Sequence, residues 1–162
     1  PEAFEEFVKP IPEDERDDMV AAYYRRLTGP DDEIRLACAR AWSMWEGAAL
    51  SLLPNPGRVA AFGAPNYAIA FARIECHYFQ HRGFLDTDDQ IIARAGLLRD
   101  IPGVIVHGRY DICTPPVTAW ELHKAWSEAE LNIVADSGHA MTEPGIVNGL
   151  VQATEKFKNR TA

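Results

Sequence analysis

Apolar residues in the first hundred positions recur at the three- and four-residue spacing of helices that bury one face. A first helix is predicted over Met19–Leu27, ending at Gly29-Pro30 because glycine followed by proline commonly terminates a helix. A second is predicted from Asp31 to Leu52, and its acidic start is favoured by the positive end of the helix dipole. The segment Pro54-Asn55-Pro56-Gly57 is expected to break it.

Two further helices are predicted before residue 101. The third covers about 66–81 and carries four large apolar residues on one side: Tyr67, Phe71, Ile74 and Tyr78. The fourth begins at Thr87-Asp88-Asp89-Gln90, a capping-box pattern, and is expected to direct Ile91, Ala95 and Leu98 inward.

From residue 101 onward the pattern changes to short strands that alternate with helices. Val104-Ile105-Val106 and Leu131-Asn132-Ile133-Val134 are apolar runs typical of buried parallel strands. Helices are predicted from Pro115-Pro116 through Trp126 and over about 144–157. This order implies a right-handed parallel crossover. Because two strands do not make a stable sheet face, the rest of the sheet is expected to come from elsewhere.

Composition and charge narrow the class of protein. The 162 residues are 47% apolar and 25% charged, which indicates an ordinary soluble globular chain. A net charge of −8 disfavours nucleic acid and membrane surfaces as partners. Three scattered cysteines without a C-x-x-C pair indicate reduced thiols and a cytoplasmic location. The acidic start shows no targeting segment, and the missing initiator Met suggests that the natural N-terminus lies elsewhere.

Asp111 and His139 are the strongest candidates for chemistry. Each follows a predicted strand, at the carboxyl end where open parallel sheets place their ligands. A carboxylate that orients an imidazole is the acid–base half of an acyl-transfer triad, and the order Asp then His is that of α/β-hydrolases. The alternative is that Asp111 is a turn residue and His139 a surface residue beside a helix. None of the four serines lies in a G-x-S-x-G turn, so this chain offers no nucleophile.

Two glutamates have unusual positions on predicted helices. Glu46 follows Trp45 in the second helix, and Glu75 lies four residues from both Phe71 and Phe79 in the third. Carboxylates near an apolar face must be paired or must line a cleft, where two of them together would bind a cation such as an amine. The alternative is a local salt bridge, for Glu75 with Arg73 or Arg82. His77 and His81 beside Cys76 lack a third ligand at suitable spacing, so no metal site is expected.

Several of these segments together resemble one family. They are Ile101-Pro102-Gly103-Val104-Ile105-Val106-His107-Gly108-Arg109-Tyr110-Asp111, Ser137-Gly138-His139, Ala41-Trp42-Ser43-Met44-Trp45-Glu46-Gly47 and Ala72-Arg73-Ile74-Glu75-Cys76-His77-Tyr78-Phe79. The chain is similar over nearly its whole length to the C-terminal half of bacterial prolyl aminopeptidases (proline iminopeptidases). The resemblance implies an α/β fold, the C-terminal part of an α/β-hydrolase. Residues 1–100 would be a helical cap segment, and residues 101–162 the last βαβα of the parallel sheet in the hydrolase core.

The resemblance also implies a function and its residues. Asp111 would be the triad acid and His139 the base, while Glu46 and Glu75 would hold the substrate's free α-amino group and Phe79 would form a wall of the prolyl pocket. The substrate would be a peptide with a free N-terminal proline, cleaved by a serine exopeptidase without metal or organic cofactor. The family's H-G-G-P-G oxyanion loop and G-G-S-W-G-S nucleophile turn are expected upstream of Pro1, and the chain by itself is expected to be inactive.

Two other functions remain open at this point. The chain could be a truncated, non-catalytic homologue that serves as a binding or complementation module. It could instead belong to a related esterase or amidase that uses the same fold. The open sheet is expected to pack against the N-terminal half of the same enzyme or against a second copy.

Overall fold

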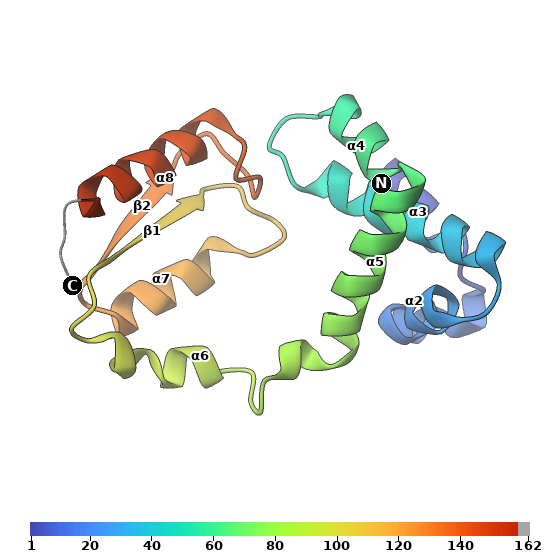
Figure 1. Ribbon diagram of the computed structural model, residues 1–162, viewed down its shortest axis with the longest axis horizontal. Helices are drawn as coiled ribbons and strands as arrows, with labels where there is room; N and C mark the ends of the chain where they lie inside the picture. Colours follow the sequence, from blue (N-terminus) through green and yellow to red (C-terminus); the bar gives the residue numbers. More distant parts are fainter. Residues whose placement is uncertain (159–162) are drawn as a thin grey trace. The chain divides into compact units, whose positions relative to one another are not determined.

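Most of the chain is helical, and one pair of parallel strands lies in its second half (Figure 1). The computed structural model describes residues 1–158, so residues 159–162 of the expected hydrolase-core range lie outside the described residues. The chain divides into two units, one of Pro1–Ala48 with Pro54–Leu85 and one of Ala49–Leu53 with the chain from Asp86 onward. The expected mixture of α and β structure is confirmed. The assignment to a cap and a hydrolase core stays a prediction.

The first unit is built from helices around one core. Its elements are α1 (Glu2–Val8), η1 (Glu13–Asp18), α2 (Met19–Thr28), α3 (Asp32–Ala49), α4 (Pro56–Phe62), α5 (Pro65–Gln80) and η2 (Arg82–Phe84). Tyr23 and Leu27 of α2 are fully buried, and Trp42 of α3 is 3% exposed. The Tyr23 and Trp42 rings meet edge to face with centroids 5.1 Å apart. This aromatic contact joins α2 to α3.

Small side chains bring α5 close to α2. Ala68, Ala72 and Cys76 form the buried stripe of α5, and the Cys76 thiol lies 3.5 Å from the Val20 carbonyl oxygen of α2. Two of the large apolar residues predicted for one side of this helix lie outside its core face, since Ile74 is 62% exposed and Tyr78 is 51% exposed, whereas Phe71 is partly buried against the core. Burial raises the pKa of the Cys76 thiol to about 12, so this cysteine is protonated.

The predicted second helix ends earlier in the structure, and an additional short helix follows it. Helix α3 begins as expected, with the Asp31 carboxylate accepting hydrogen bonds from the Glu33 and Ile34 amides, but it ends at Ala49 instead of Leu52. The predicted break after this helix is present, and its last residues, Pro56 and Gly57, begin α4, a helix that was not predicted. Asn55 caps this helix by accepting a hydrogen bond from the Arg58 amide. Pro56 occupies the first turn, where the backbone N–H that proline lacks would have no partner within the helix.

The predicted fourth helix is wrong in its extent. The chain forms only α6 (Gln90–Ala93) and the short helix η3 (Ala95–Leu98). The Thr87 hydroxyl bonds the Asp89 side chain instead of capping a helix, so the capping box is not formed. Ala95 is buried as expected, whereas Ile91 is 60% exposed.

The strands of the second unit pair in parallel and carry a helix on each face. Its remaining elements are β1 (Gly103–Gly108), α7 (Pro116–Ala125), β2 (Ala129–Val134) and α8 (Pro144–Phe157). The register aligns Gly103 with Ala129 and Gly108 with Val134. Helices α7 and α8 lie on opposite faces of the pair (Figure 1). The predicted strand–helix–strand–helix order is thus confirmed, and no helix among residues 1–158 is long and apolar enough to span a bilayer.

Acid should weaken the contact between η1 and α2. The Glu15 carboxylate accepts hydrogen bonds from Arg26 and Arg25, which lower its pKa to about 2. A carboxyl whose pKa is lowered by folding stabilises the fold above its unfolded pKa and loses that contribution as the pH falls through the folded pKa. We expect the free energy of unfolding to decline between pH 4.5 and pH 2 more steeply in the wild type than in Glu15→Gln.

This comparison requires urea titrations at several pH values, with Glu13→Gln as the matched control in the same short helix. Equal pH slopes for the wild type and Glu15→Gln would contradict the role assigned to the Glu15–arginine pairs.

Candidate functional site

The site lies where the two parallel strands end. Because both strands run in the same direction, the loops that follow β1 and β2 leave the sheet at the same edge. The Tyr110 amide donates to the Ser137 carbonyl oxygen at 3.0 Å, which ties the loops together. Gly108 permits this approach, because a Cβ at this position would lie 1.9 Å from the Gly138 carbonyl oxygen.

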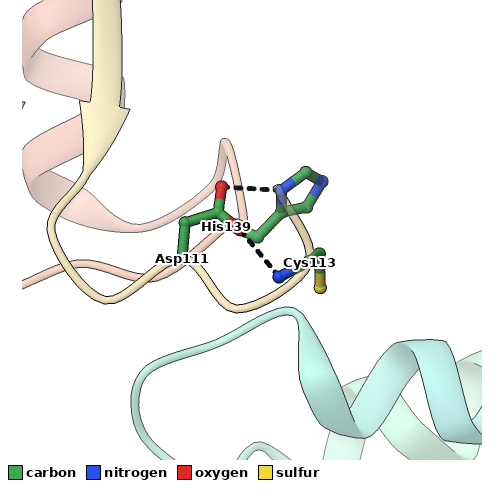
Figure 2. A group of neighbouring side chains, drawn as sticks. All are labelled: Asp111, Cys113 and His139. Carbon is green, nitrogen blue, oxygen red and sulfur yellow. Dashed lines mark hydrogen bonds and ion pairs between the residues drawn. The ribbon is translucent and has the colours of Figure 1, made fainter. Parts of the chain in front are cut away.

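Asp111 and His139 meet across these loops. The Nδ1 atom of His139 lies 2.9 Å from Oδ2 of Asp111, and the pair is drawn in Figure 2. The carboxylate is 4% exposed and the imidazole 37% exposed. The hydrogen bond expected between the two side chains is confirmed, and the reading of Asp111 and His139 as unconnected turn and surface residues is wrong.

The Asp111 carboxylate is also held by its own loop. Its Oδ1 atom accepts from the Cys113 and Thr114 amides at 3.0 and 2.8 Å, and its Oδ2 atom accepts from the Thr114 hydroxyl at 2.9 Å. Burial raises the pKa of this carboxyl, but hydrogen bonds from the Thr114 backbone, His139 and the Thr114 hydroxyl together outweigh burial and leave the pKa below its usual value of 3.8. Asp111 is therefore a carboxylate at neutral pH.

This geometry fixes the imidazole for proton transfer. A carboxylate accepts hydrogen bonds only, so the proton on the His139 ring sits on Nδ1. Figure 2 shows the other ring nitrogen turned away from Asp111. An imidazole with Nδ1 donating to a carboxylate and Nε2 available to accept a proton is suited to act as a general base.

The sequence analysis did not single out Thr114, which contacts both members of the pair. The Thr114 hydroxyl lies 3.2 Å from His139 Nδ1 as well as bonding Asp111, while the Thr114 carbonyl oxygen lies 2.9 Å from His107 Nε2. His107 Nε2 is also 3.5 Å from Asp111 Oδ2. The contact between Thr114 and Asp111 could have been predicted from the segment Asp111-Ile112-Cys113-Thr114, because an Asp side chain often accepts hydrogen bonds from the amides two and three residues later.

Asp111, Cys113 and His139 offer ligand atoms that all lie within 4.8 Å of one another, a spacing that a metal ion could use. However, both oxygens of Asp111 already accept hydrogen bonds from its loop and from His139. The arrangement therefore suits an oriented acid–base pair better than a metal centre. His77 and His81, the two histidines considered as metal ligands in the sequence, lie in the first unit. His77 Nδ1 lies 3.4 Å from the Tyr24 hydroxyl, and His81 Nδ1 bonds the His77 carbonyl oxygen.

The candidate amine-binding residues gather around Trp42 in the first unit. The Trp42 indole Nε1 donates to Glu75 Oε2 at 2.6 Å, and the Phe79 ring lies 6.0 Å from the Trp42 ring. Phe79 is 52% exposed, and Glu46 is half-buried one turn after Trp42 on α3. The hydrogen bond between Trp42 and Glu75 was not predicted from the sequence. The amine-binding role of Glu46 and Glu75 stays a prediction.

Two of the chain's serines have no access to solvent. Ser43 is fully buried and its hydroxyl donates to the Ala68 carbonyl oxygen at 3.2 Å. Ser137 is 2% exposed, although it lies two residues before His139. Neither is placed to attack a substrate.

No family model matches the chain. It is similar to curated proteins, at 52% identity over 157 residues to a probable proline iminopeptidase of Leptolyngbya boryana and at 48% over 157 residues to a proline iminopeptidase of Xanthomonas citri. A proline iminopeptidase of Arabidopsis thaliana is 48% identical over 159 residues. These alignments include 97%, 97% and 98% of this chain and 49%, 50% and 42% of the relatives. The chain thus spans about half the length of the curated relatives it matches.

The resemblance seen in the motifs is confirmed by these alignments. Nearly the whole of this chain is homologous to about half of a proline iminopeptidase, a hydrolase.

Proposed function

We propose that this chain is the C-terminal part of an α/β-hydrolase that releases N-terminal proline from peptides. Asp111 and His139 would be the acid and base of its triad, and the nucleophilic serine would come from the remaining half of the enzyme. The observation that carries the proposal is the 2.9 Å hydrogen bond between His139 and Asp111 in a chain homologous to proline iminopeptidases.

The proposed reaction is an acyl transfer. The serine oxygen attacks the prolyl carbonyl carbon while His139 Nε2 takes the serine proton, and the same nitrogen then gives that proton to the leaving amine. Water repeats the sequence on the acyl-enzyme and releases proline. Asp111 stabilises the imidazolium that forms in each step, and backbone amides of the remaining half stabilise the oxyanion. The mechanism requires no metal or organic cofactor.

Glu46, Glu75 and Phe79 are proposed to bind the proline. Two carboxylates would hold the protonated imino group, and the half-exposed Phe79 ring would contact the pyrrolidine. Support comes from the Trp42 indole, which fixes one Glu75 oxygen, and from the 6.0 Å Trp42–Phe79 ring contact. A blocked or internal proline lacks the positive charge that the two carboxylates would attract, which disfavours its binding.

The partial exposure of the sheet favours a partner that covers it. Strands of parallel sheets are ordinarily buried on both faces, yet Val104, Val106 and Ile133 are only half-buried here. Nearby, Val117 is 57% and Trp120 is 50% exposed on α7. We propose that the N-terminal half of the same enzyme covers this surface, with a second copy of the chain as the alternative occupant. A cytoplasmic location is part of the proposal and stays a prediction.

Catalysis should require both halves. We expect the purified chain to show no hydrolysis of proline arylamide, because it supplies the base without the nucleophile. Joining it to the half of the Leptolyngbya boryana relative that it does not match gives what we call the combined enzyme, which should be active. In the combined enzyme His139→Ala should lower kcat by about a thousandfold or more.

An aryl ester assayed in parallel separates the peptidase from an esterase. Full activity of the combined enzyme carrying His139→Ala would contradict the proposal. Hydrolysis by the chain alone would reveal a nucleophile in it, and a stable but inactive combined enzyme would favour a non-catalytic binding module.

Neutralising Glu75 should weaken proline binding with little effect on folding. Glu75→Gln retains a carbonyl oxygen that can accept from Trp42 but loses the charge that would pair with the imino group. Removing one partner of a desolvated charge pair costs about 2 kcal/mol or more, so kcat/KM for proline arylamide should fall at least roughly thirtyfold. Melting temperatures and kinetics of the combined enzyme are the measurements.

Glu33→Gln, an exposed substitution in the first turn of α3, is the matched control. An unchanged kcat/KM in Glu75→Gln would remove the amine-binding role while leaving the triad proposal intact.

A further inference from the structure

The connector that follows α3 is bound to the loop that carries His139. Residues Ala49–Leu53 belong to the second unit, although the residues on either side of them belong to the first. The Leu50 carbonyl oxygen accepts hydrogen bonds from the His139 amide at 2.9 Å and from the Ala140 amide at 2.8 Å. The backbone of His139 is therefore fixed by a segment that is about ninety residues away in the sequence.

Glu143 completes this attachment from the other side. Its Oε1 atom accepts from the Leu52 amide at 3.0 Å, and its Oε2 atom accepts from the Gly138 amide at 2.9 Å. One carboxylate thus bridges the connector and the residue directly before His139. Glu143 is itself held in place, because it precedes Pro144 at the start of α8 and its own amide donates to the Ala140 carbonyl oxygen at 2.9 Å.

The backbone at Gly138 lies in close contact with the connector. A Cβ on this residue would lie 2.8 Å from the Leu52 nitrogen and 3.2 Å from the Leu50 oxygen, so only glycine permits the loop to lie against the connector. The contact explains why α3 ends at Ala49: beyond it, the Leu50 carbonyl and the Leu52 amide serve the His139 loop instead of a further helical turn.

We propose that Glu143 is a positioning residue for His139, acting with the connector at Leu50 and Leu52 to hold the base at its distance from Asp111 and the nucleophile. The proposal rests on the proposed function. Asp111 fixes only the Nδ1 side of the imidazole, whereas the direction of Nε2 depends on the backbone at residues 138–140. Glu143 and Leu50 make four hydrogen bonds that fix this backbone and its connector. A small displacement of a catalytic group is enough to slow proton transfer strongly.

The test compares variants of Glu143 in the combined enzyme. Glu143→Ala removes both acceptor oxygens, and Glu143→Gln keeps one of them. Glu155→Ala on the same helix is the matched control, because Glu155 is exposed and, within residues 1–158, pairs with Lys158 at the surface. We expect kcat to fall about ten- to a hundredfold in Glu143→Ala, with KM changed less than about threefold and an intermediate loss in Glu143→Gln.

Proton NMR of the 162-residue chain alone, without the other half of the combined enzyme, gives a readout independent of the nucleophile. The His139 Nδ1 proton, shared with Asp111, should give a low-field proton resonance in the wild type and in Glu155→Ala. In Glu143→Ala this resonance should broaden or vanish, because a loosened loop lets the proton exchange with water.

The outcomes separate this inference from the proposed function. If His139→Ala abolishes activity while Glu143→Ala matches Glu155→Ala, the triad stands and the positioning role is overturned. An effect on KM alone overturns it as well, as does a fall in kcat that follows the melting temperature in parallel across the Glu143 variants. If His139→Ala is active, the proposed function fails, and the resonance of the chain alone still decides whether Glu143 holds the imidazole.

Discussion

The arrangement of the second unit depends on one constraint: a carboxylate and an imidazole from different loops must lie 2.9 Å apart. Parallel pairing of β1 and β2 brings the two loops to the same edge, and the absence of a side chain on Gly108 lets them touch. The Asp111 carboxylate is buried, which by itself disfavours its charge, so its loop provides two amides and a hydroxyl that compensate. The strand pairing, the glycine and the loop sequence all serve this one contact.

The parts of this site that follow from local sequence were predictable. Asp111 and His139 lie three and five residues beyond the ends of β1 and β2, and the rule that parallel strands end at one edge was enough to bring them together. The start of α3 and the existence of α7 and α8 also followed from local signals, since caps and apolar spacing act within a few residues.

What could not be predicted depends on contacts between distant segments. The apolar spacing that continued to Leu52 gave no sign that α3 ends at Ala49, because the competing partners are His139, Ala140 and Glu143. In the same way, Glu75 carried no local signal for Trp42, thirty-three residues away in the sequence. The exposed Ile74 and Tyr78 show a related limit, because helical spacing locates an apolar stripe but the packing of small residues against α2 decides which face is buried.

The acid–base pair adopts its geometry through contacts within the second unit. Among the described residues, the hydrogen bonds that hold Asp111 and the His139 backbone come from residues 50–52, 108, 113–114 and 138–143 of this chain. Under the proposed function, the remaining half of the enzyme would therefore add a nucleophile to a base that is already oriented, and would not have to organise that base on docking. Preorganisation of this kind would place the free-energy cost of ordering the imidazole in the folding of the second unit and not in the transition state of the proposed reaction. The hydrogen bonds between the connector after α3 and the His139 loop have a related role. The imidazole is 37% exposed, so few side-chain contacts hold it in place. Its orientation therefore depends on a rigid backbone, which these hydrogen bonds provide.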